Sequence, residues 1–161
     1  MKIILAVDKD FGIGKDNELL FHFKKDLKHF KDTTLNSTII MGRKTYESMG
    51  GALPKRENLV LTRNKDYRID DGIVFNDVDD LLKYVKSKKG NVFVIGGAQI
   101  VDMLLPFCNE AIITKIDDKK KADTFLHNFD EDPDFEVYKK SDIVVEDNVK
   151  FQYVYYRRKD D

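Results

Sequence analysis

The chain has 161 residues, of which 42% are hydrophobic and 35% are charged, and its formal net charge at pH 7 is -1. This length and composition predict one globular domain over residues 1–161, large enough to bury a core. The balanced charge argues against a nucleic-acid partner, and the lack of a long apolar stretch argues against a membrane-spanning helix.

Eight short apolar segments predict β-strands, and four amphipathic segments predict helices. The predicted strands are residues 2–7, 37–42, 58–62, 72–75, 91–96, 110–116, 135–140 and 150–157. The predicted helices are residues 24–34, 44–49, 77–86 and 97–105. Alternation of apolar strands and helices favours the α/β class, with a central, mostly parallel eight-stranded sheet and about four flanking helices. The last two strands, joined by the turn-rich link 141–148, predict an antiparallel hairpin at the C-terminal edge.

The first predicted helix carries one charge in an unusual place. At about 100° per residue, Phe23, Leu27 and Phe30 share one face of this helix, and Asp26 falls within or beside that apolar stripe. An acidic residue in the first helical turn favours the helix dipole, which would explain an exposed Asp26. It does not explain a carboxylate near the core, so we favour a role in binding the donor edge of a heterocyclic ligand.

Four loops beyond the carboxyl ends of predicted strands have residues suited to a nucleotide, and ligands of open α/β sheets bind at that edge. IMGRKTYES (40–48) puts two cations at a helix start that suits a phosphate, although a solvated turn is the alternative. VFVIGGAQIV (92–101) places two glycines where a backbone approaches a ligand or makes a tight turn. LTRN (61–64) offers a hydroxyl and a cation, and the long polar loop 8–23 is typical of a lid.

Thr114, the three histidines and the single cysteine give weaker indications of function. Thr114 is a hydroxyl in an apolar strand, which reflects either β propensity or a polar contact at the wall of a site. The three histidines have no metal-like spacing, so we expect no metal site. The single cysteine, Cys108, rules out an internal disulfide and favours a cytoplasmic protein. Its apolar setting favours a packing role over a nucleophilic one.

Taken in order, these motifs resemble the dihydrofolate reductase family of the bacterial chromosomal type. The resemblance rests on AVDKDFGIGKDNELLFHFKKDLKHFK, IIMGRKTYES, LPKRENLVLTR, VFVIGGAQI and the pair ITKI and ADTFL, and it covers nearly the whole chain. It implies an oxidoreductase that uses NADPH to reduce 7,8-dihydrofolate to 5,6,7,8-tetrahydrofolate. In that reaction a hydride passes to C6 of the pterin and N5 takes a proton. Antifolate binding is expected with it. A monomer is expected separately, because no exposed apolar helix face stands out in the sequence.

The resemblance also assigns roles to individual residues. It implies that Asp26 binds the pterin 2-amino group and N3 and, with Phe21 and Thr114, takes part in catalysis. The residues expected to contact the substrate are Leu5, Ala6, Asp26, Leu27, Phe30, Met49, Leu53, Arg56 and Thr114. Among these, Arg56 is expected to pair with the α-carboxylate of the substrate's glutamate tail.

A longer set is expected to contact the cofactor. It comprises Ala6, Ile13, Gly14, Leu19, Gly42, Arg43, Lys44, Thr45, Leu61, Thr62, Arg63, Ile95, Gly96, Gly97, Ala98, Gln99 and Val101. Within it, Thr62 and Arg63 are assigned to the adenosine 2′-phosphate, which favours NADPH over NADH. A cis peptide bond is expected between Gly96 and Gly97.

Three departures from the family pattern stand out. Leu20-Phe21 occupies the place of the usual Pro-Trp, so the indole N–H is missing. Val101 stands where many members have tyrosine, and Ala98-Gln99 replaces a third glycine and a basic residue. Two alternatives follow: a reductase of the same fold acting on another pterin or a ribosylamino-pyrimidine, and a nucleotide-binding protein without chemistry. Asp26 with Arg56 argues against the first, and the intact glycine pair argues against the second.

Overall fold

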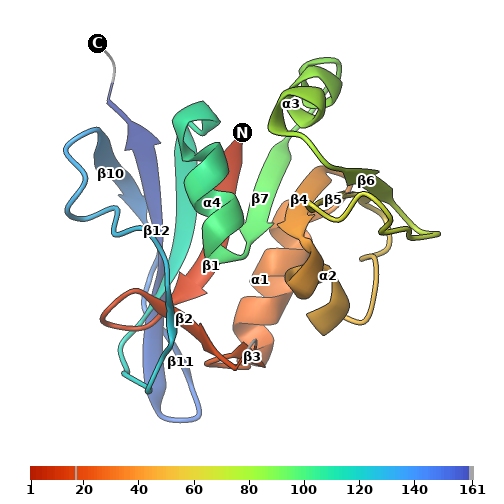
Figure 1. The fold of residues 1–161 in the computed structure, drawn as a ribbon. Coiled ribbons are helices and arrows are strands. Elements are labelled where there is room, and N and C mark those ends of the chain that lie inside the picture. The colour runs from red at the N-terminus through yellow and green to blue at the C-terminus, as the bar shows by residue number, and fades with distance from the viewer. Residues whose placement is uncertain (17, 160–161) are drawn as a thin grey trace.

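The structure, a computed structural model that describes residues 1–16 and 18–159, is organised around one large sheet (Figure 1). Its strands are β1 (Lys2–Val7), β4 (Thr38–Gly42), β5 (Glu57–Leu61), β6 (Ile73–Phe75), β7 (Val92–Gly96), β8 (Glu110–Ile116), β10 (Phe135–Lys140), β11 (Val144–Glu146) and β12 (Val149–Arg158). Eight of them lie in the order β10-β12-β8-β1-β7-β4-β5-β6, and β11 pairs with β12 beside this path.

The pairing directions confirm the predicted class. The strands from β8 through β1, β7, β4 and β5 to β6 are parallel, whereas β12 is antiparallel to both β8 and β10. The structure adds a ninth strand, because the link 141–148, expected to be only a turn, contains β11. Asp147 and Asn148, between β11 and β12, have φ angles of 51° and 63°, as in tight hairpin turns that favour Asp and Asn.

Four α-helices among the described residues match the predicted number. They are α1 (Lys24–Thr34), α2 (Arg43–Ser48), α3 (Val78–Lys86) and α4 (Ala98–Leu104), and a single 3-10 turn, η1 (Leu105–Phe107), follows α4. Leu81 of α3 and Leu104 of α4 pack in one core cluster with Ile3. Phe30 of α1 packs in a second cluster with Ile4. Because neighbouring strand residues point to opposite faces, the sheet is covered on both sides, as its apolar strands predict.

The lid, which we define as residues 8–23, contains strands that its sequence does not predict. β2 (Gly12–Lys15) and β3 (Glu18–Leu19) form a small sheet with β9 (Thr124–Phe125) in the order β3-β2-β9. Buried Asp8 shapes the turn into β2 by accepting from the backbone N–H of Gly12 at 2.8 Å. Asp123 accepts from the backbone N–H of Asp16 at 3.0 Å. Strands this short and glycine-rich give no alternating pattern from which to predict them.

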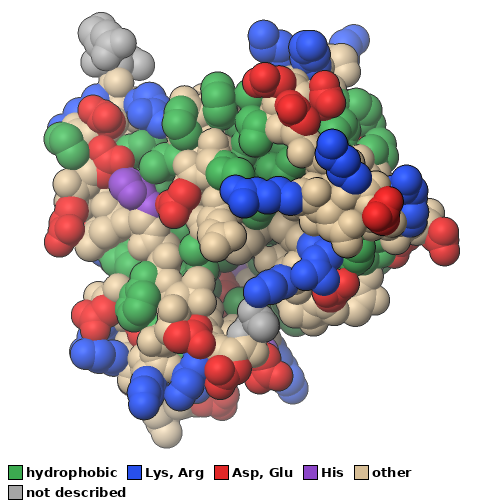
Figure 2. Space-filling view, viewed as in Figure 1, with side chains coloured by type: hydrophobic (Ala, Val, Ile, Leu, Met, Phe, Trp, Pro, Cys, Tyr) green, Lys and Arg blue, Asp and Glu red, His purple; other side chains and the backbone are tan. Residues whose placement is uncertain are grey.

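The surface agrees with the balanced composition. Figure 2 shows acidic and basic side chains interspersed over the visible face. Among the residues that the structure describes, no helix combines the length and the apolar character needed to cross a bilayer.

Candidate active site

Several of the predicted site residues, among them Gly42, Leu61 and Gly96, stand at the carboxyl ends of parallel strands of the large sheet. The β1–β8 register places Ala6 beside Thr114, and the β4–β7 register places Met41 beside Gly96. In Figure 1, β1 and β7 point toward the edge where β2 and β3 of the lid lie. The topology thus brings the lid, the acid-bearing helix and the glycine pair to the edge at which open α/β sheets bind ligands.

Asp26 faces inward from the first turn of α1, while Lys24, Lys25 and Lys28 are exposed. The Thr114 hydroxyl donates to Asp26 Oδ1 at 2.7 Å. Burial raises the pKa of Asp26 above its ordinary value, the Thr114 hydrogen bond lowers it in part, and the charge of Glu146 raises it. The residue predicted as the exception on this helix is therefore a carboxyl group that accepts from a hydroxyl of β8, in surroundings that raise its pKa.

The start of α1 is held by a residue that the sequence analysis misses. The Glu146 carboxylate accepts hydrogen bonds from the backbone N–H groups of Lys24, at 2.8 Å, and Lys25, at 2.9 Å. Phe23, at the N-cap, gives no side-chain hydrogen bond. The absence of Ser, Thr, Asp or Asn before Lys24 was the available signal that a more distant side chain must cap this helix.

Aromatic rings connect the lid to the region around Asp26. Phe21 stacks on Phe23, with ring centroids 5.6 Å apart, and Phe23 stacks on Phe151 at 5.1 Å. Lys120 Nζ lies 4.7 Å from the centroid of the Phe21 ring and donates to the carbonyl of Leu20 at 2.9 Å. The Leu20-Phe21 pair is therefore fixed by a lysine and by ring stacking, two contacts that the sequence analysis does not include.

Tyr153 and His29 form a further aromatic pair, next to Phe151, whose ring centroid lies 6.1 Å from that of Tyr153. The rings of Tyr153 and His29 stack with centroids 3.7 Å apart, and the tyrosine hydroxyl donates to the carbonyl of Lys25 at 3.4 Å. Burial and the nearby Asp26 charge raise the pKa of Tyr153 to about 12. The tyrosine is thus a neutral neighbour of Asp26 at neutral pH.

The glycine pair lies against the start of α2. The peptide bond between Gly96 and Gly97 is cis, as expected. Gly96 has a φ of 129°, and a Cβ atom added there would lie 3.7 Å from Thr45 Oγ1. At Gly42, an added Cβ would lie 3.0 Å from Ile100 Cγ1, which is tighter than ordinary van der Waals contact. These glycines bring two strand ends and the first turn of α2 into close proximity.

Arg56 lies beyond the carboxyl-terminal end of α1 and is anchored by several neighbours. Its guanidinium donates to Thr34 Oγ1 at 2.9 Å, to the carbonyl of Pro54 at 2.6 Å and to the carbonyl of Lys31 at 2.5 Å. These contacts fix the plane of the guanidinium and occupy three of the five N–H groups that an arginine has.

The expected substrate-wall residues are incompletely buried. Leu5, Ala6, Phe30, Met49 and Leu53 are each partly buried. Leu27 does not pack into the core with Phe23, because 52% of its surface is exposed, compared with 9% for Phe23. Leu27 therefore extends the apolar surface beside Asp26.

The expected cofactor residues divide into three groups. Ile13, Gly14, Gly42, Leu61, Ile95 and Gly96 are buried, Arg43, Thr45, Thr62, Gly97 and Ala98 are partly buried, and Leu19, Lys44, Arg63 and Gln99 are exposed. Val101 is 0% exposed and belongs to the core cluster with Leu104.

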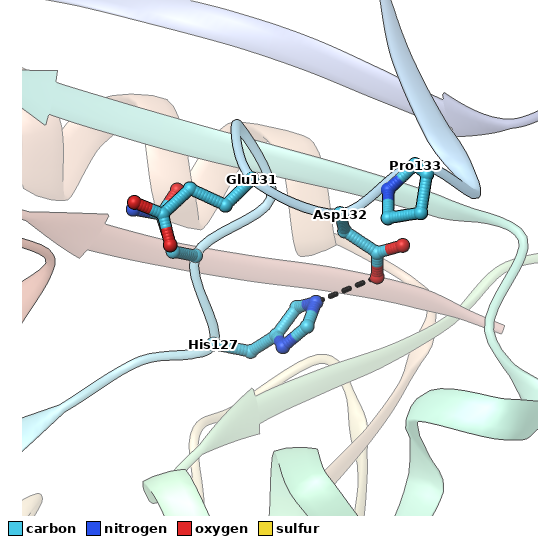
Figure 3. Close-up of a pocket in the computed structure, with 5 residues that line it drawn as sticks. His127, Glu131, Asp132 and Pro133 are labelled. Atoms are coloured by element: carbon cyan, nitrogen blue, oxygen red, sulfur yellow. Dashed lines mark hydrogen bonds and ion pairs between the residues drawn. The ribbon is translucent and has the colours of Figure 1, made fainter.

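A cavity of about 430 Å³ lies elsewhere, in the loop between β9 and β10. Figure 3 shows His127, Glu131, Asp132 and Pro133 lining it, with His127 Nε2 2.7 Å from Asp132 Oδ2. None of the predicted site residues lines this cavity, and we do not assign it to the active site. Within the described part of the chain, no three His, Cys, Asp or Glu side chains are grouped to hold a metal.

Cys108 is a buried free thiol, as predicted. Burial raises its pKa to about 11. A thiol with this pKa carries little thiolate at neutral pH, which fits packing and not nucleophilic chemistry.

Comparison with known proteins agrees with this geometry. The family model of dihydrofolate reductase matches residues 1–158. The dihydrofolate reductase of Staphylococcus haemolyticus is 37% identical over 133 residues, covering 81% of this chain and 80% of its own. That of Bacillus subtilis (strain 168) is 40% identical over 131 residues, covering 81% and 77%.

A solved structure supports the same relationship. Dihydrofolate reductase from Enterococcus faecalis, complexed with NADP(H) and RAB-propyl, superimposes with a TM-score of 0.90 at 34% identity. The match covers 99% of this chain and 96% of that one. This chain belongs to the dihydrofolate reductase family.

Proposed function

We propose that this chain catalyses NADPH-dependent reduction of 7,8-dihydrofolate to 5,6,7,8-tetrahydrofolate, by hydride transfer to C6 and protonation at N5. It does so as a monomer in the cytoplasm, with residues 1–161 forming one catalytic domain. The family match and the neighbour complexed with NADP(H) support the reaction and the cofactor. The single observation that carries the site assignment is the inward-facing Asp26, hydrogen-bonded to Thr114 at the edge where the glycine pair lies.

Asp26 binds the pterin through its 2-amino group and N3. Thr114 holds one carboxylate oxygen, and an ionised carboxylate has about four lone-pair sites, so further donors are accommodated. The low-dielectric surroundings that raise the pKa of Asp26 also strengthen its hydrogen bonds to the ring. Asp26 thereby orients the pterin and favours the proton on N5, which water delivers.

NADPH supplies the hydride when it is bound, and the chain contributes by positioning the two rings. Ala6, Gly96 and Gly97 lie where a flat ring can approach the backbone closely. Gly42, Lys44 and Thr45, at the start of α2, hold the phosphates. Arg43, which donates to Glu47 Oε1 at 3.2 Å, and the exposed Arg63 are the main cations for the 2′-phosphate, with Thr62 beside Arg63.

Arg56 binds the α-carboxylate of the glutamate tail. Its three backbone and hydroxyl contacts hold the guanidinium in one orientation, and a planar guanidinium matches a carboxylate with two parallel hydrogen bonds. Leu27, Phe30, Met49 and Leu53 provide apolar surface between Arg56 and Asp26. Antifolates that carry the same donor edge as the pterin bind at Asp26 as well.

The test is consumption of NADPH by the purified protein with dihydrofolate, repeated with NADH and with two variants. Asp26→Asn is expected to lower turnover by about a hundredfold or more, since loss of a preorganised polar contact costs about that much. Asp32→Asn, an exposed aspartate on the same helix, is the matched control and is expected to retain turnover.

Two outcomes would contradict the proposal. Tight NADPH binding without turnover would favour a nucleotide-binding protein that lacks chemistry. Preferential turnover of another pterin or of a ribosylamino-pyrimidine would favour a related reductase.

A further inference from the structure

Glu146 links the C-terminal hairpin to the helix that carries Asp26. It is the last residue of β11, and its two carboxylate oxygens accept from the first two N–H groups of α1, at 2.8 and 2.9 Å. Lys25 Nζ donates in turn to the carbonyl of Val145 at 3.1 Å. Three hydrogen bonds therefore dock the first turn of α1 onto β11, a strand 120 residues away in sequence.

The contact of Glu146 matters because it lies at the first turn of α1. The first four N–H groups of a helix have no partner inside the helix, and a side chain at the N-cap usually satisfies one of them. Here Phe23 supplies no such hydrogen bond. Asp26 lies in the same turn as Lys24 and Lys25, so the direction of its carboxylate depends on how that turn is held.

We propose that Glu146 is a positioning residue for the reaction, which sets the first turn of α1 so that Asp26 meets the pterin. The inference rests on the proposed function of Asp26. Glu146 touches backbone N–H groups and not the reacting atoms, and it acts through the helix turn and through its charge.

The charge of Glu146 gives the inference a readout that a purely structural contact would not have. The groups around Asp26 are the Thr114 hydroxyl from β8, Glu146 from β11, Tyr153 from β12 and His29 from α1 itself. Burial is the largest cause of the raised Asp26 pKa, and the Glu146 charge adds to it. Neutralising Glu146 therefore lowers the pKa of Asp26.

The experiment compares Glu146→Gln and Glu146→Ala with Asp77→Ala. Asp77 is the matched control because it caps α3, accepting from the N–H groups of Asp79 at 2.7 Å and Asp80 at 3.2 Å, and α3 carries no site residue. The readouts are the titration of the Asp26 side-chain carboxyl followed by carbon NMR without ligands, the pH profile of kcat/KM, and thermal unfolding.

We expect both Glu146 variants to move the Asp26 titration to lower pH and to move the pH profile in the same direction. Glu146→Ala, which also removes both hydrogen bonds, is expected to raise the KM for dihydrofolate about tenfold, because small misplacements at a site are amplified in rate. Asp77→Ala is expected to lower the unfolding temperature while leaving KM and the Asp26 titration unchanged.

An unchanged Asp26 titration in both Glu146 variants would overturn the inference, as would an equal change in KM for Asp77→Ala. These outcomes are separate from failure of the proposed function. If Asp26→Asn retained full turnover, the role of Asp26 would be wrong, whereas the NMR titration would still report whether Glu146 acts on that carboxylate.

Discussion

Replacing Thr114 with valine removes one hydroxyl from the site and leaves a side chain of nearly the same shape. Thr114 is 3% exposed, and its hydroxyl donates to Asp26 Oδ1 at 2.7 Å. The substitution leaves the partly buried Asp26 Oδ1 without this hydrogen-bond donor. Because the hydrogen bond favours the ionised form, its loss raises the pKa of Asp26 further.

The expected loss of activity follows from the energy of a hydrogen bond to a charged group. A hydrogen bond to a charged group is worth about 1.5–3 kcal/mol, and each 1.4 kcal/mol corresponds to about tenfold in an equilibrium or rate. Thr114 is too buried for solvent to screen the contact. We therefore expect kcat/KM for dihydrofolate to fall by about 10- to 100-fold, with a smaller effect on NADPH binding.

The assay is the pH dependence of kcat/KM, which reports groups of the free enzyme. Its midpoint is expected to move to higher pH in Thr114→Val, opposite to the shift expected for Glu146→Gln. Thr38→Val, at a buried threonine at the start of β4, is the matched control and is expected to leave the midpoint in place. A midpoint that stays fixed or moves to lower pH in Thr114→Val would show that the Thr114 hydroxyl does not stabilise the ionised form of Asp26.

Three further predictions address the cofactor, the lid and stability. Arg63→Ala is expected to raise the KM for NADPH by about tenfold or more and to leave NADH use unchanged; equal losses with both cofactors would show that the 2′-phosphate lies elsewhere. Lys120→Met keeps the alkyl stem but removes the charge over Phe21 and the hydrogen bond to Leu20. Turnover of Lys120→Met is expected to fall severalfold, while the free energy of unfolding changes by less than about 0.5 kcal/mol. Lys121→Met, at the exposed neighbouring lysine, is the control. Identical turnover in the two variants would show that the contact of Lys120 with the lid does not contribute to turnover. Because the folded-state pKa of Asp26 is raised above 3.8, folding favours the protonated acid, and this stabilising contribution is lost as pH rises through the raised pKa. In urea unfolding, the free energy of unfolding of Asp26→Asn is therefore expected to exceed that of the natural chain at neutral pH but not in acid. The reverse order would show that burial does not raise the pKa of Asp26.

The parallel part of the large sheet was predictable because β1, β4, β5 and β7 are nearly continuous apolar runs. Parallel strands place their carboxyl ends together, so the convergence of Thr114, Gly42 and Gly96 followed from topology. Asp26 was identifiable because a single charge broke the pattern of an otherwise segregated helix.

The contacts that hold the site in place were not predictable in the same way. Glu146 lies 122 residues from Lys24, and Lys120 lies 100 residues from Leu20. Isolated charged residues this far apart in sequence show no periodicity that would connect them. The lid strands β2 and β3, and β9 that pairs with β2, were missed because they contain two to four residues each.

Val101 is instructive for a different reason. The spacing of Val101 and Leu104 favours burial on one face of α4, and both side chains are 0% exposed. The expected cofactor contact of Val101 came from the resemblance alone, and the burial of its side chain agrees with the local pattern.

The most direct test of the central claim is a single turnover in which the protein, loaded with NADPH deuterated at the transferred position, is mixed with dihydrofolate. Deuterium is expected at C6 of the tetrahydrofolate product. The transfer rate is expected to fall strongly in Asp26→Asn while NADPH binding persists. Transfer at the full rate in Asp26→Asn, or product without deuterium at C6, would contradict the proposed function.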